Sequence, residues 1–365
     1  MKPLHSPIYL TVAFKQAGET TLSDRGFDLK YSREENPTVR ELERSLAALE
    51  GGRDALAFNS GIGAISALYL SLLSEGDEIV LPMEGYGTTI QLAERLSKFG
   101  VKTKLVYPNG DSIVEAIGGG TKLVLVETLT NPTLKVIDVP EVVRRAKEVG
   151  AITIVDNTFS PLVFKPLKVG ADASVHSLTK YIAGHNDVLG GAVIWGSLDG
   201  EELWHWRRRL GSILQPLEAW LVTRGMKTLE IRFERQSKNA LAIAEFLSEH
   251  PRVREVRYPG LKEDPYHETA RRLFERPLFG GVVSFRHVGG EEGAKKFLRS
   301  LKRIFPSPSL GGVESLASYP VISAAKTMPP ERRELLGITD DLIRLSVGLE
   351  DLDTLIEDID SALGG

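Results

Sequence analysis

Residues 151–158, Ala151-Ile152-Thr153-Ile154-Val155-Asp156-Asn157-Thr158, form an apolar run that ends in a carboxylate. A continuous run rich in β-branched residues is typical of a parallel strand that is buried on both faces. A second short run, residues 173–176, leads into Ser177-Leu178-Thr179-Lys180. In open α/β sheets ligands bind at the carboxyl ends of the strands, so these two strand ends predict a binding site.

The same pattern continues on either side of these two runs. Residues 38–200 alternate between amphipathic helical stretches and short runs rich in β-branched residues, which is the pattern of βαβ units. A first helix is predicted at residues 38–50, where Leu42, Leu46 and Leu49 share one face. The other strands expected in this region are residues 78–81, 103–106, 123–127 and 190–195.

After residue 200 the sequence becomes helical and then returns to a mixed α/β pattern. The expected helices are residues 201–210, 216–225, 226–250 and 350–363, and the expected strands are residues 253–257, 281–286 and 343–347. We therefore predict an α/β protein with three parts. These are an N-terminal arm (residues 1–37), a large domain with a mostly parallel sheet (38–230) and a smaller C-terminal α/β domain (231–365).

The composition excludes several classes of function. The chain has 365 residues and a formal net charge of −4, so nucleic acid is not an expected partner. It contains no cysteine, which excludes disulfides, zinc knuckles and a thiol nucleophile, and no metal site is predicted. No stretch approaches the roughly 20 apolar residues that span a membrane, and residues 1–10 lack the apolar run of a signal peptide. We expect a soluble, cytoplasmic protein.

Lys180 is the first candidate catalytic residue. A lysine amine can form a Schiff base with an aldehyde cofactor, and the hydroxyl groups of Ser177 and Thr179 can bind a phosphate near that amine. Asp156, 24 residues earlier, suits a pyridine nitrogen because a fixed anion keeps that nitrogen protonated. A single lysine is usually a surface charge and a single aspartate often caps a turn, but the two together favour a cofactor site.

Two further segments fit a flat, phosphorylated cofactor. Residues 59–65 place Gly61 and Gly63 at the start of an apolar helix, where backbone N–H groups bind anions. This segment lacks the third glycine and the upstream strand of a dinucleotide fingerprint, so a nicotinamide cofactor is not expected. Tyr86 lies between two glycines after the strand expected at residues 78–81, and its ring can stack on a cofactor, although an ordinary loop tyrosine fits the same pattern.

Together these motifs resemble the Cys/Met-metabolism family of pyridoxal-phosphate enzymes. The family includes cystathionine γ-synthases, γ-lyases and β-lyases, methionine γ-lyases and O-acylhomoserine sulfhydrylases. The resemblance extends from Pro7-Ile8-Tyr9 to Gly348-Leu349-Glu350-Asp351, and it implies the type I fold of aspartate aminotransferase. The motifs in between are Tyr31-Ser32-Arg33, Asn36-Pro37-Thr38, Ser60-Gly61, Tyr86-Gly87, Thr130-Asn131-Pro132-Thr133, Asp156-Asn157-Thr158, Ser177-Leu178-Thr179-Lys180-Tyr181, Gly184-His185, Ser309-Leu310-Gly311-Gly312 and Arg344-Leu345-Ser346.

The resemblance implies a role for each site residue. Lys180 would bind pyridoxal 5'-phosphate covalently and move protons, Asp156 would pair with its ring nitrogen, and Tyr86 would stack on its ring and act as an acid or base. Tyr31 and Arg33 would reach the phosphate site of a neighbouring subunit, which implies a homodimer and, in most members, a pair of dimers. The remaining contacts are phosphate binding by Gly61, Ile62, Ser177 and Thr179, contact with the ring hydroxyl by Asn131, and binding of the substrate carboxylate by Asn131, Ser309 and Arg344. With Lys180 and Tyr86, Tyr31 completes the set of catalytic candidates.

The substrate is an amino acid, and members of the family differ around its distal end. Many cystathionine γ-lyases and γ-synthases have glutamate where this chain has Pro308, and methionine γ-lyases usually have cysteine where it has Thr88. We expect a γ-lyase or γ-synthase that acts at Cγ. The first alternative is a methionine γ-lyase or an O-acylhomoserine sulfhydrylase, and the next is a cystathionine β-lyase. Intact catalytic motifs disfavour a non-catalytic cofactor-binding protein, and their spacing disfavours an aminotransferase.

Overall fold

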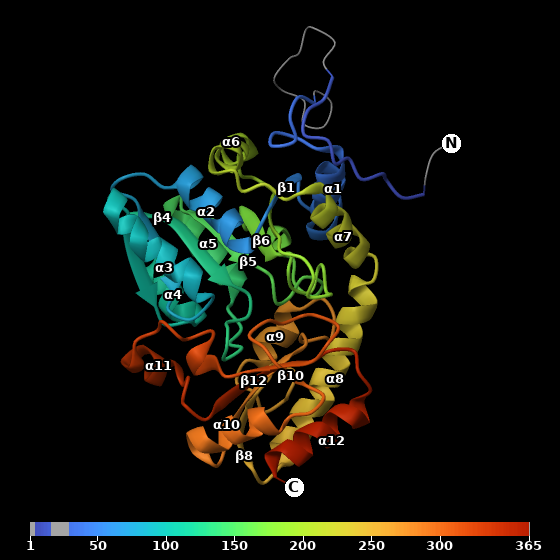
Figure 1. Ribbon diagram of the computed structural model, residues 1–365. Helices are drawn as coiled ribbons and strands as arrows, with labels where there is room; N and C mark the ends of the chain where they lie inside the picture. The colour runs from blue at the N-terminus through green and yellow to red at the C-terminus, as the bar shows by residue number, and fades with distance from the viewer. Residues whose placement is uncertain (1–3, 16–28, 365) are drawn as a thin grey trace.

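The computed structural model describes residues 4–15 and 29–364 (Figure 1). Its larger sheet has seven strands in the order β1-β7-β6-β5-β4-β2-β3. They are β1 (Asp54–Phe58), β2 (Glu78–Pro82), β3 (Lys102–Val106), β4 (Thr121–Glu127), β5 (Ile152–Asp156), β6 (Ala173–Ser177) and β7 (Gly191–Trp195). Strand β7 is antiparallel to β1 and β6, and the other neighbouring pairs are parallel. The sheet is therefore mostly parallel, as predicted.

Helices cover both faces of this sheet because its strands are apolar on both sides. On one face, Leu125, Ile154 and Val175 pack with α2 (Gly61–Leu72), α3 (Gly87–Arg95) and α6 (Gly200–Leu210). The opposite face, which includes Val126 and Val155, packs with a second set of helices. These are α1 (Pro37–Glu50), α4 (Gly110–Ala116), α5 (Val139–Val149) and α7 (Pro216–Met226). Within the described residues, no helix is both long and apolar enough to cross a membrane.

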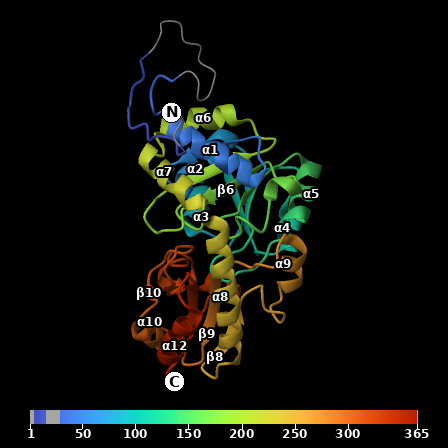
Figure 2. The ribbon, with the colours of Figure 1, turned by 90° about the vertical axis from the view of Figure 1, so that its right-hand side faces the viewer.

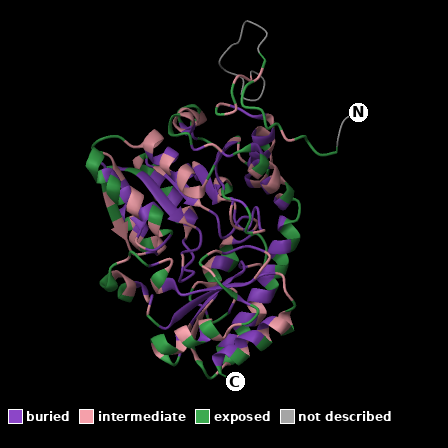
Figure 3. Cartoon of the chain, viewed as in Figure 1, coloured by how far each residue is buried: buried purple, intermediate pink, exposed green. Residues whose placement is uncertain are grey.

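A second sheet of five strands lies in the C-terminal part of the chain, in the order β10-β11-β12-β9-β8. The strands are β8 (Val253–Arg257), β9 (Val282–His287), β10 (Phe305–Pro306), β11 (Leu316–Ser318) and β12 (Leu342–Ser346). The helices of this part are α8 (Leu229–Glu249), α9 (His267–Leu273), α10 (Gly290–Ser300), α11 (Pro330–Leu336) and α12 (Leu352–Leu363). Three short 3₁₀ segments are η1 (Leu96–Phe99), η2 (Pro166–Val169) and η3 (Pro320–Ile322). Buried residues concentrate in both sheets (Figure 3).

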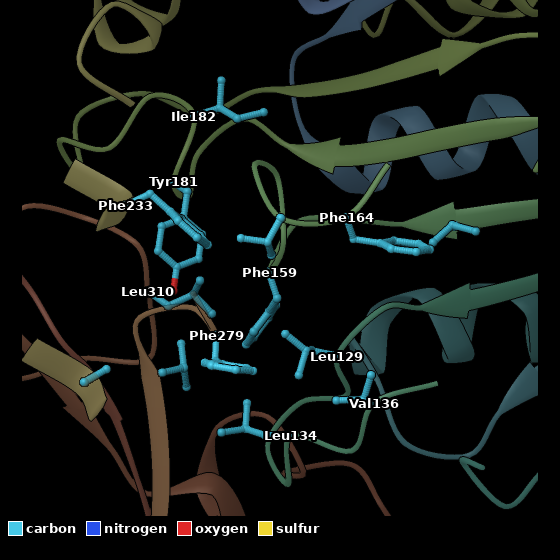
Figure 4. Close-up of a cluster of buried hydrophobic side chains, with 14 of the residues drawn as sticks. Leu129, Leu134, Val136, Phe159, Phe164, Tyr181, Ile182, Phe233, Phe279 and Leu310 are labelled. Carbon is cyan, nitrogen blue, oxygen red and sulfur yellow. The ribbon is translucent and has the colours of Figure 1, made fainter. Parts of the chain in front are cut away.

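One apolar cluster joins the two sheets (Figure 4). The rings of Tyr181 and Phe233 meet edge to face with centroids 5.1 Å apart, and the Tyr181 hydroxyl accepts the N–H of Gly281 at 2.9 Å. Helix α8 runs from the large sheet along the small one (Figure 2), and Arg232 near its start donates to the carbonyl of Tyr181 at 2.8 Å. Because the core is continuous across this junction, the domain boundary at residue 230 remains a proposal.

Two local predictions were wrong. A strand, β1, does precede Gly61, although Asp54-Ala55-Leu56-Ala57-Phe58 contains no β-branched residue and so gives a weak strand signal. Pairing with β7 and complete burial of residues 55–58 make it a strand. The argument against a nicotinamide cofactor therefore keeps only the missing third glycine. The long helix starts at Leu229 rather than at residue 226, because α7 extends to Met226 and a turn separates the two helices.

A buried ion pair holds α1 and α6 against β1. Arg207 Nη1 lies 2.6 Å from Glu43 Oε1, and both side chains are almost completely buried. Glu43 Oε1 also accepts the N–H of Ala57 at 3.0 Å, and Arg207 donates to the carbonyl of Glu34 at 2.8 Å. Since β1 leads directly into α2, this pair helps to fix the N-terminus of α2.

Replacing Arg207 by leucine should leave the Glu43 carboxylate buried without its closest cation, at a cost of about 3–5 kcal/mol. We expect a large fall in the urea midpoint of unfolding, measured by tryptophan fluorescence, because all four tryptophans lie between residues 195 and 220. Arg209→Leu is the matched control, since Arg209 pairs with Glu202 on the exposed side of the same helix. Exposed pairs contribute about 1 kcal/mol or less, so equal midpoints for the two variants would contradict the prediction.

Candidate active site

The carboxyl ends of β4, β5 and β6 place Glu127, Asp156 and Ser177 on one face of the large sheet. The residues two positions before each of them belong to the apolar cluster beneath α2 and α3. Successive side chains of a strand alternate between faces, so the three polar residues continue on that same face. The parallel register also pairs Glu127 with Asp156 across β4 and β5. Two acidic groups and one hydroxyl therefore lie together at this edge of the sheet.

Helix α2 begins against these strand ends. Its N-cap, Ser60, accepts the N–H of Gly63 through its hydroxyl at 3.1 Å. The N–H groups of Gly61 and Ile62 lie in the first turn of α2. No helical turn precedes them, so they have no carbonyl partner within the helix. A Cβ on Gly61 would lie 3.2 Å from Cβ of Ser177, so the start of α2 packs directly on Ser177. These two amides and the serine hydroxyl form an arrangement suited to a phosphate.

Lys180 lies in the turn after β6 and is half-buried. Its Nζ donates to Ser309 Oγ at 3.0 Å, although Ser309 comes from the C-terminal part of the chain. Burial lowers the pKa of Lys180 to about 8, and the charge of Arg344 is the second cause. A considerable fraction of this amine is thus neutral near pH 8, and the neutral amine is the nucleophilic form.

Arg344 on β12 joins the two sheets at the site. Its buried guanidinium donates to Asn131 Oδ1 at 2.8 Å, in the loop after β4. It also donates to the carbonyl groups of Pro308 at 2.8 Å and Ser309 at 3.0 Å. The Nε–H of Arg344 has no hydrogen-bond partner among the described residues. A buried guanidinium with an unused N–H suits a carboxylate ligand.

Tyr86 precedes α3, and 49% of its surface is exposed, so its ring is free to stack on a ligand. Its amide donates to Glu127 Oε1 at 2.5 Å. A segment between η3 and α11 of the C-terminal part packs beside this helix. There the Gln91 side chain donates to the hydroxyl of Thr327, and in α11 itself Arg332 Nη2 lies 3.7 Å from Glu94 Oε1. The site is therefore formed by both parts of the chain.

A buried polar network lies on the opposite face of the sheet, behind Asp156. Asn157 donates to Glu50 Oε1 at 3.1 Å and accepts the hydroxyl of Thr128 at 2.8 Å, while His176 bonds to Glu50. Burial raises the pKa of Asp156, and hydrogen bonds from Thr158 and the charge of His176 oppose this effect. The network thus supports the loop after β5, and its member His176 favours the ionised form of Asp156.

Three residues of the site were not predicted from the sequence. Thr158 joins β5 to β6, since its amide donates to Asp156 Oδ1 at 3.0 Å and its hydroxyl accepts the amide of Ser177 at 2.8 Å. Glu84 accepts the amide of Thr133 at 2.8 Å and thereby holds the loop of Asn131. Glu127 is the third, and the sequence does contain a signal for it. Like Asp156, it is a carboxylate that ends an apolar strand.

Tyr31 and Arg33 take part in none of these contacts. The Arg33 guanidinium lies 5.1 Å from the ring centroid of Tyr31, whose surface is 42% exposed, and Tyr31 forms a bridge with Ala13. Both belong to the predicted arm, which precedes α1 in the chain. In Figure 1, α1 lies at the opposite end of the molecule from β12. Residues 1–3 and 16–28 of that arm lie outside the described residues.

The other predicted residues come together in one chain, where the side chains of Thr179 and Asn131 are held by the contacts of neighbouring residues. The Thr179 hydroxyl accepts the amide of Gly190 at 3.1 Å, and the side-chain oxygen of Asn131 accepts Arg344. In the part of the chain that the structure describes, no group of three or more His, Cys, Asp or Glu residues can hold a metal ion.

Comparison with known proteins shows the family to which the chain belongs. Residues 1–364 match the family described as Cys/Met metabolism PLP-dependent enzyme. A cystathionine gamma-lyase from Bacillus subtilis (strain 168) is 43% identical over 363 residues, covering 98% of this chain and 93% of that protein. A cystathionine beta-lyase from Lactococcus lactis subsp. cremoris (strain MG1363) is 42% identical over 361 residues, with coverage of 98% and 93%.

A solved structure gives the same result for the fold. The cystathionine gamma synthase from Xanthomonas oryzae pv. oryzae, in complex with aminoacrylate and cysteine, has a TM-score of 0.92 and 39% identity. The match covers 98% of this chain and 92% of that one. The predicted fold and resemblance are confirmed. The chain belongs to the Cys/Met-metabolism family and is an enzyme that depends on pyridoxal phosphate.

Proposed function

We propose that this enzyme acts at Cγ of a sulfur amino acid, as a cystathionine γ-lyase or γ-synthase. The observation that carries the proposal is the meeting of Lys180, Ser309 and Arg344. The Lys180 amine lies 3.0 Å from Ser309 Oγ, and the backbone carbonyl of Ser309 accepts a bond from Arg344. An amino acid whose carboxylate binds Arg344 therefore presents its α-carbon near a partly neutral amine. Relatives named for γ-lyase and γ-synthase activity support the sulfur amino-acid substrate.

The residues of the cleft fit pyridoxal phosphate. Lys180 supplies an amine for the aldehyde, and the exposed ring of Tyr86 suits a flat partner. Asp156 supplies an anion for the ring nitrogen, and the amides at the start of α2 with Ser177 suit the phosphate. When bound, the cofactor supplies an electron sink that stabilises negative charge on the substrate. We assign a further phosphate contact to Thr179, whose hydroxyl also accepts the amide of Gly190. We assign contact with the ring hydroxyl to the side-chain amide of Asn131, whose oxygen accepts Arg344.

The chain's own residues then hold the substrate and move its protons. Arg344 and Ser309 orient the carboxylate, so that the α-hydrogen faces the Lys180 amine. Since burial and the charge of Arg344 lower the pKa of Lys180 to about 8, the amine can accept a proton and release it again near that pH. Reaction at Cγ needs a second proton to leave Cβ, and the flexible Lys180 side chain is the base that can serve both carbons.

A second candidate is β-lyase activity on cystathionine. The Lactococcus lactis relative named as a β-lyase is almost as similar to this chain as the γ-lyase relative. Methionine is a further possible substrate. Pro308 provides no carboxylate to bind the distal ammonium group of cystathionine, so this part of the site does not select cystathionine over methionine.

We further propose that two subunits share each active site, in a cytoplasmic homo-oligomer that pairs dimers. Tyr31 and Arg33 lie apart from the other candidate residues of their own chain. Large apolar side chains are exposed in the arm, including Leu10 (70%) and Val12 (54%), and in the large part of the chain, including Leu189 (68%) and Leu217 (49%). Contact with a second copy would bury such residues.

Trace labelling of the cofactor-free enzyme with acetic anhydride, followed by mass spectrometry, should show Lys180 half-reactive at about pH 8. Below this pH the amine is protonated and unreactive. Arg344→Leu should move the midpoint upward, because it removes one of the two causes of the lowered pKa while burial remains. A wild-type midpoint near the ordinary lysine value of 10.5 would contradict the assignment.

The substrate is tested by incubating the holoenzyme separately with cystathionine, with methionine, and with an O-acylhomoserine plus cysteine. A γ-lyase releases cysteine and 2-oxobutanoate from cystathionine, whereas a β-lyase releases homocysteine and pyruvate, and a γ-synthase forms cystathionine. We expect chemistry at Cγ. Pyruvate as the main product from cystathionine would overturn the γ assignment and establish the second candidate.

Subunit sharing is tested by mixing Lys180→Ala and Arg33→Ala chains, each of low activity alone. If Arg33 serves the neighbouring site, each mixed dimer has one site with both lesions and one with neither. Activity should then reappear as the subunits exchange, which mass spectrometry can follow independently. Complete exchange without recovered activity would show that Arg33 acts within its own subunit.

A further inference from the structure

Glu127 is a carboxyl group in the cofactor half of the site to which no role has yet been given. It is the last residue of β4 and stands beside Asp156 in the parallel register of β4 and β5. Both side chains lie on the same face of the sheet, where each residue is half-buried. Glu127 is therefore next to the residue proposed to pair with the ring nitrogen.

Glu127 also contacts the residue proposed to stack on the ring. Its Oε1 accepts the amide of Tyr86 at 2.5 Å. A Cβ on Gly85 would lie only 2.7 Å from the same oxygen, so any larger residue there would force the Glu127 carboxyl group to shift. One side chain thus links the strand end of Asp156 to the start of α3.

The electrostatic surroundings of Glu127 disfavour its ionised form. Removal from water raises the pKa of Glu127 well above its ordinary value, and the charges of Asp156 and Glu84 raise it further. The bond from the Tyr86 amide opposes these effects. Glu84 is itself paired with Lys135 at 2.7 Å, so that lysine is already engaged. Two adjacent carboxyl groups cannot both ionise at low cost, and one of them keeps a proton.

We propose that Glu127 carries a proton at neutral pH and serves as a positioning residue for Asp156 and Tyr86. In this form its carbonyl oxygen accepts the Tyr86 amide, and Asp156 alone presents a full negative charge to the ring nitrogen. An ionised Glu127 would repel Asp156 and raise the cost of keeping that residue charged. The part of this proposal that concerns the ring nitrogen rests on the proposed function.

The first test uses the cofactor-free enzyme and follows its thermal midpoint between pH 5 and pH 8. A carboxyl group whose pKa is raised by folding stabilises the protein fully below its unfolded-state pKa, and this stabilisation is lost as pH rises toward the folded-state pKa. Glu127→Gln removes this loss, so the midpoint of the variant should rise relative to the wild type with increasing pH. Glu115→Gln, at an exposed position of α4, is the matched control and should keep the wild-type slope. An unchanged slope in Glu127→Gln would overturn the proposal.

The second test measures the dissociation constant of pyridoxal phosphate for Glu127→Gln and Glu127→Ala. Glutamine is neutral and still accepts the Tyr86 amide, so it should rescue most of the affinity. Alanine should weaken binding by about tenfold, because the Tyr86 amide loses its partner. If glutamine weakens binding as much as alanine does, the negative charge is required and the proposal is overturned.

The two tests separate this proposal from the proposed function. The thermal measurement involves no cofactor, so it depends only on the protonation of Glu127 in the folded chain. Failure of the cofactor assignment would appear instead as an Asp156→Asn variant that binds pyridoxal phosphate as tightly as the wild type. The pH difference between Glu127→Gln and the wild type would still be present in that case.

Discussion

The buried guanidinium of Arg344 is the interaction on which the candidate active site depends. It belongs to β12 of the small sheet, yet it donates to Asn131 in a loop of the large sheet. It also holds the backbone of residues 308 and 309, next to the oxygen that receives the Lys180 amine. The same positive charge lowers the pKa of Lys180. One side chain therefore joins the two sheets at the site and acts on the reactivity of the nearby amine.

The large sheet contributes to the site through its register. Because parallel strands end at one edge, Glu127, Asp156 and Ser177 come together although they are far apart in sequence. Burial then couples the ionisation of Glu127 to that of Asp156, since a second anion beside Asp156 is costly. The register of the strands thus brings together two carboxyl groups whose pKa values are both raised by burial.

Local sequence patterns predicted those elements whose structure is determined by neighbouring residues in the sequence. Strands β5 and β6 are apolar runs, and the chemistry of Lys180 and Asp156 follows from their places after those runs. Strand β1 was missed because only its pairing with β7 makes a strand of an alanine-rich segment. The contact of Arg344 with Asn131 spans 213 residues, and an arginine on an amphipathic strand is by itself a surface charge.

Resemblance to a family supplied what local patterns lack, including the roles of Ser309 and Arg344. Within this one chain, the structure brings these residues to Lys180. It leaves Tyr31 and Arg33 in the arm, so their roles stay predictions that concern a second subunit. The protonation of Glu127 has no sequence signal, because it depends on the register between two strands.

The two halves of the site differ in how they are built. The cofactor half lies on one continuous sheet with a buried core, while Pro308 and the segment beside α3 belong to loops of the other sheet. Contacts of that segment with α3, such as that of Thr327 with Gln91, lie at the surface. Substitutions in these loops leave the buried core of the large sheet intact, although those at residues 308 and 309 also reach Lys180 through Arg344 and Ser309. Evolution can diversify the reaction on a constant framework, and overall identity then measures the framework more than the chemistry.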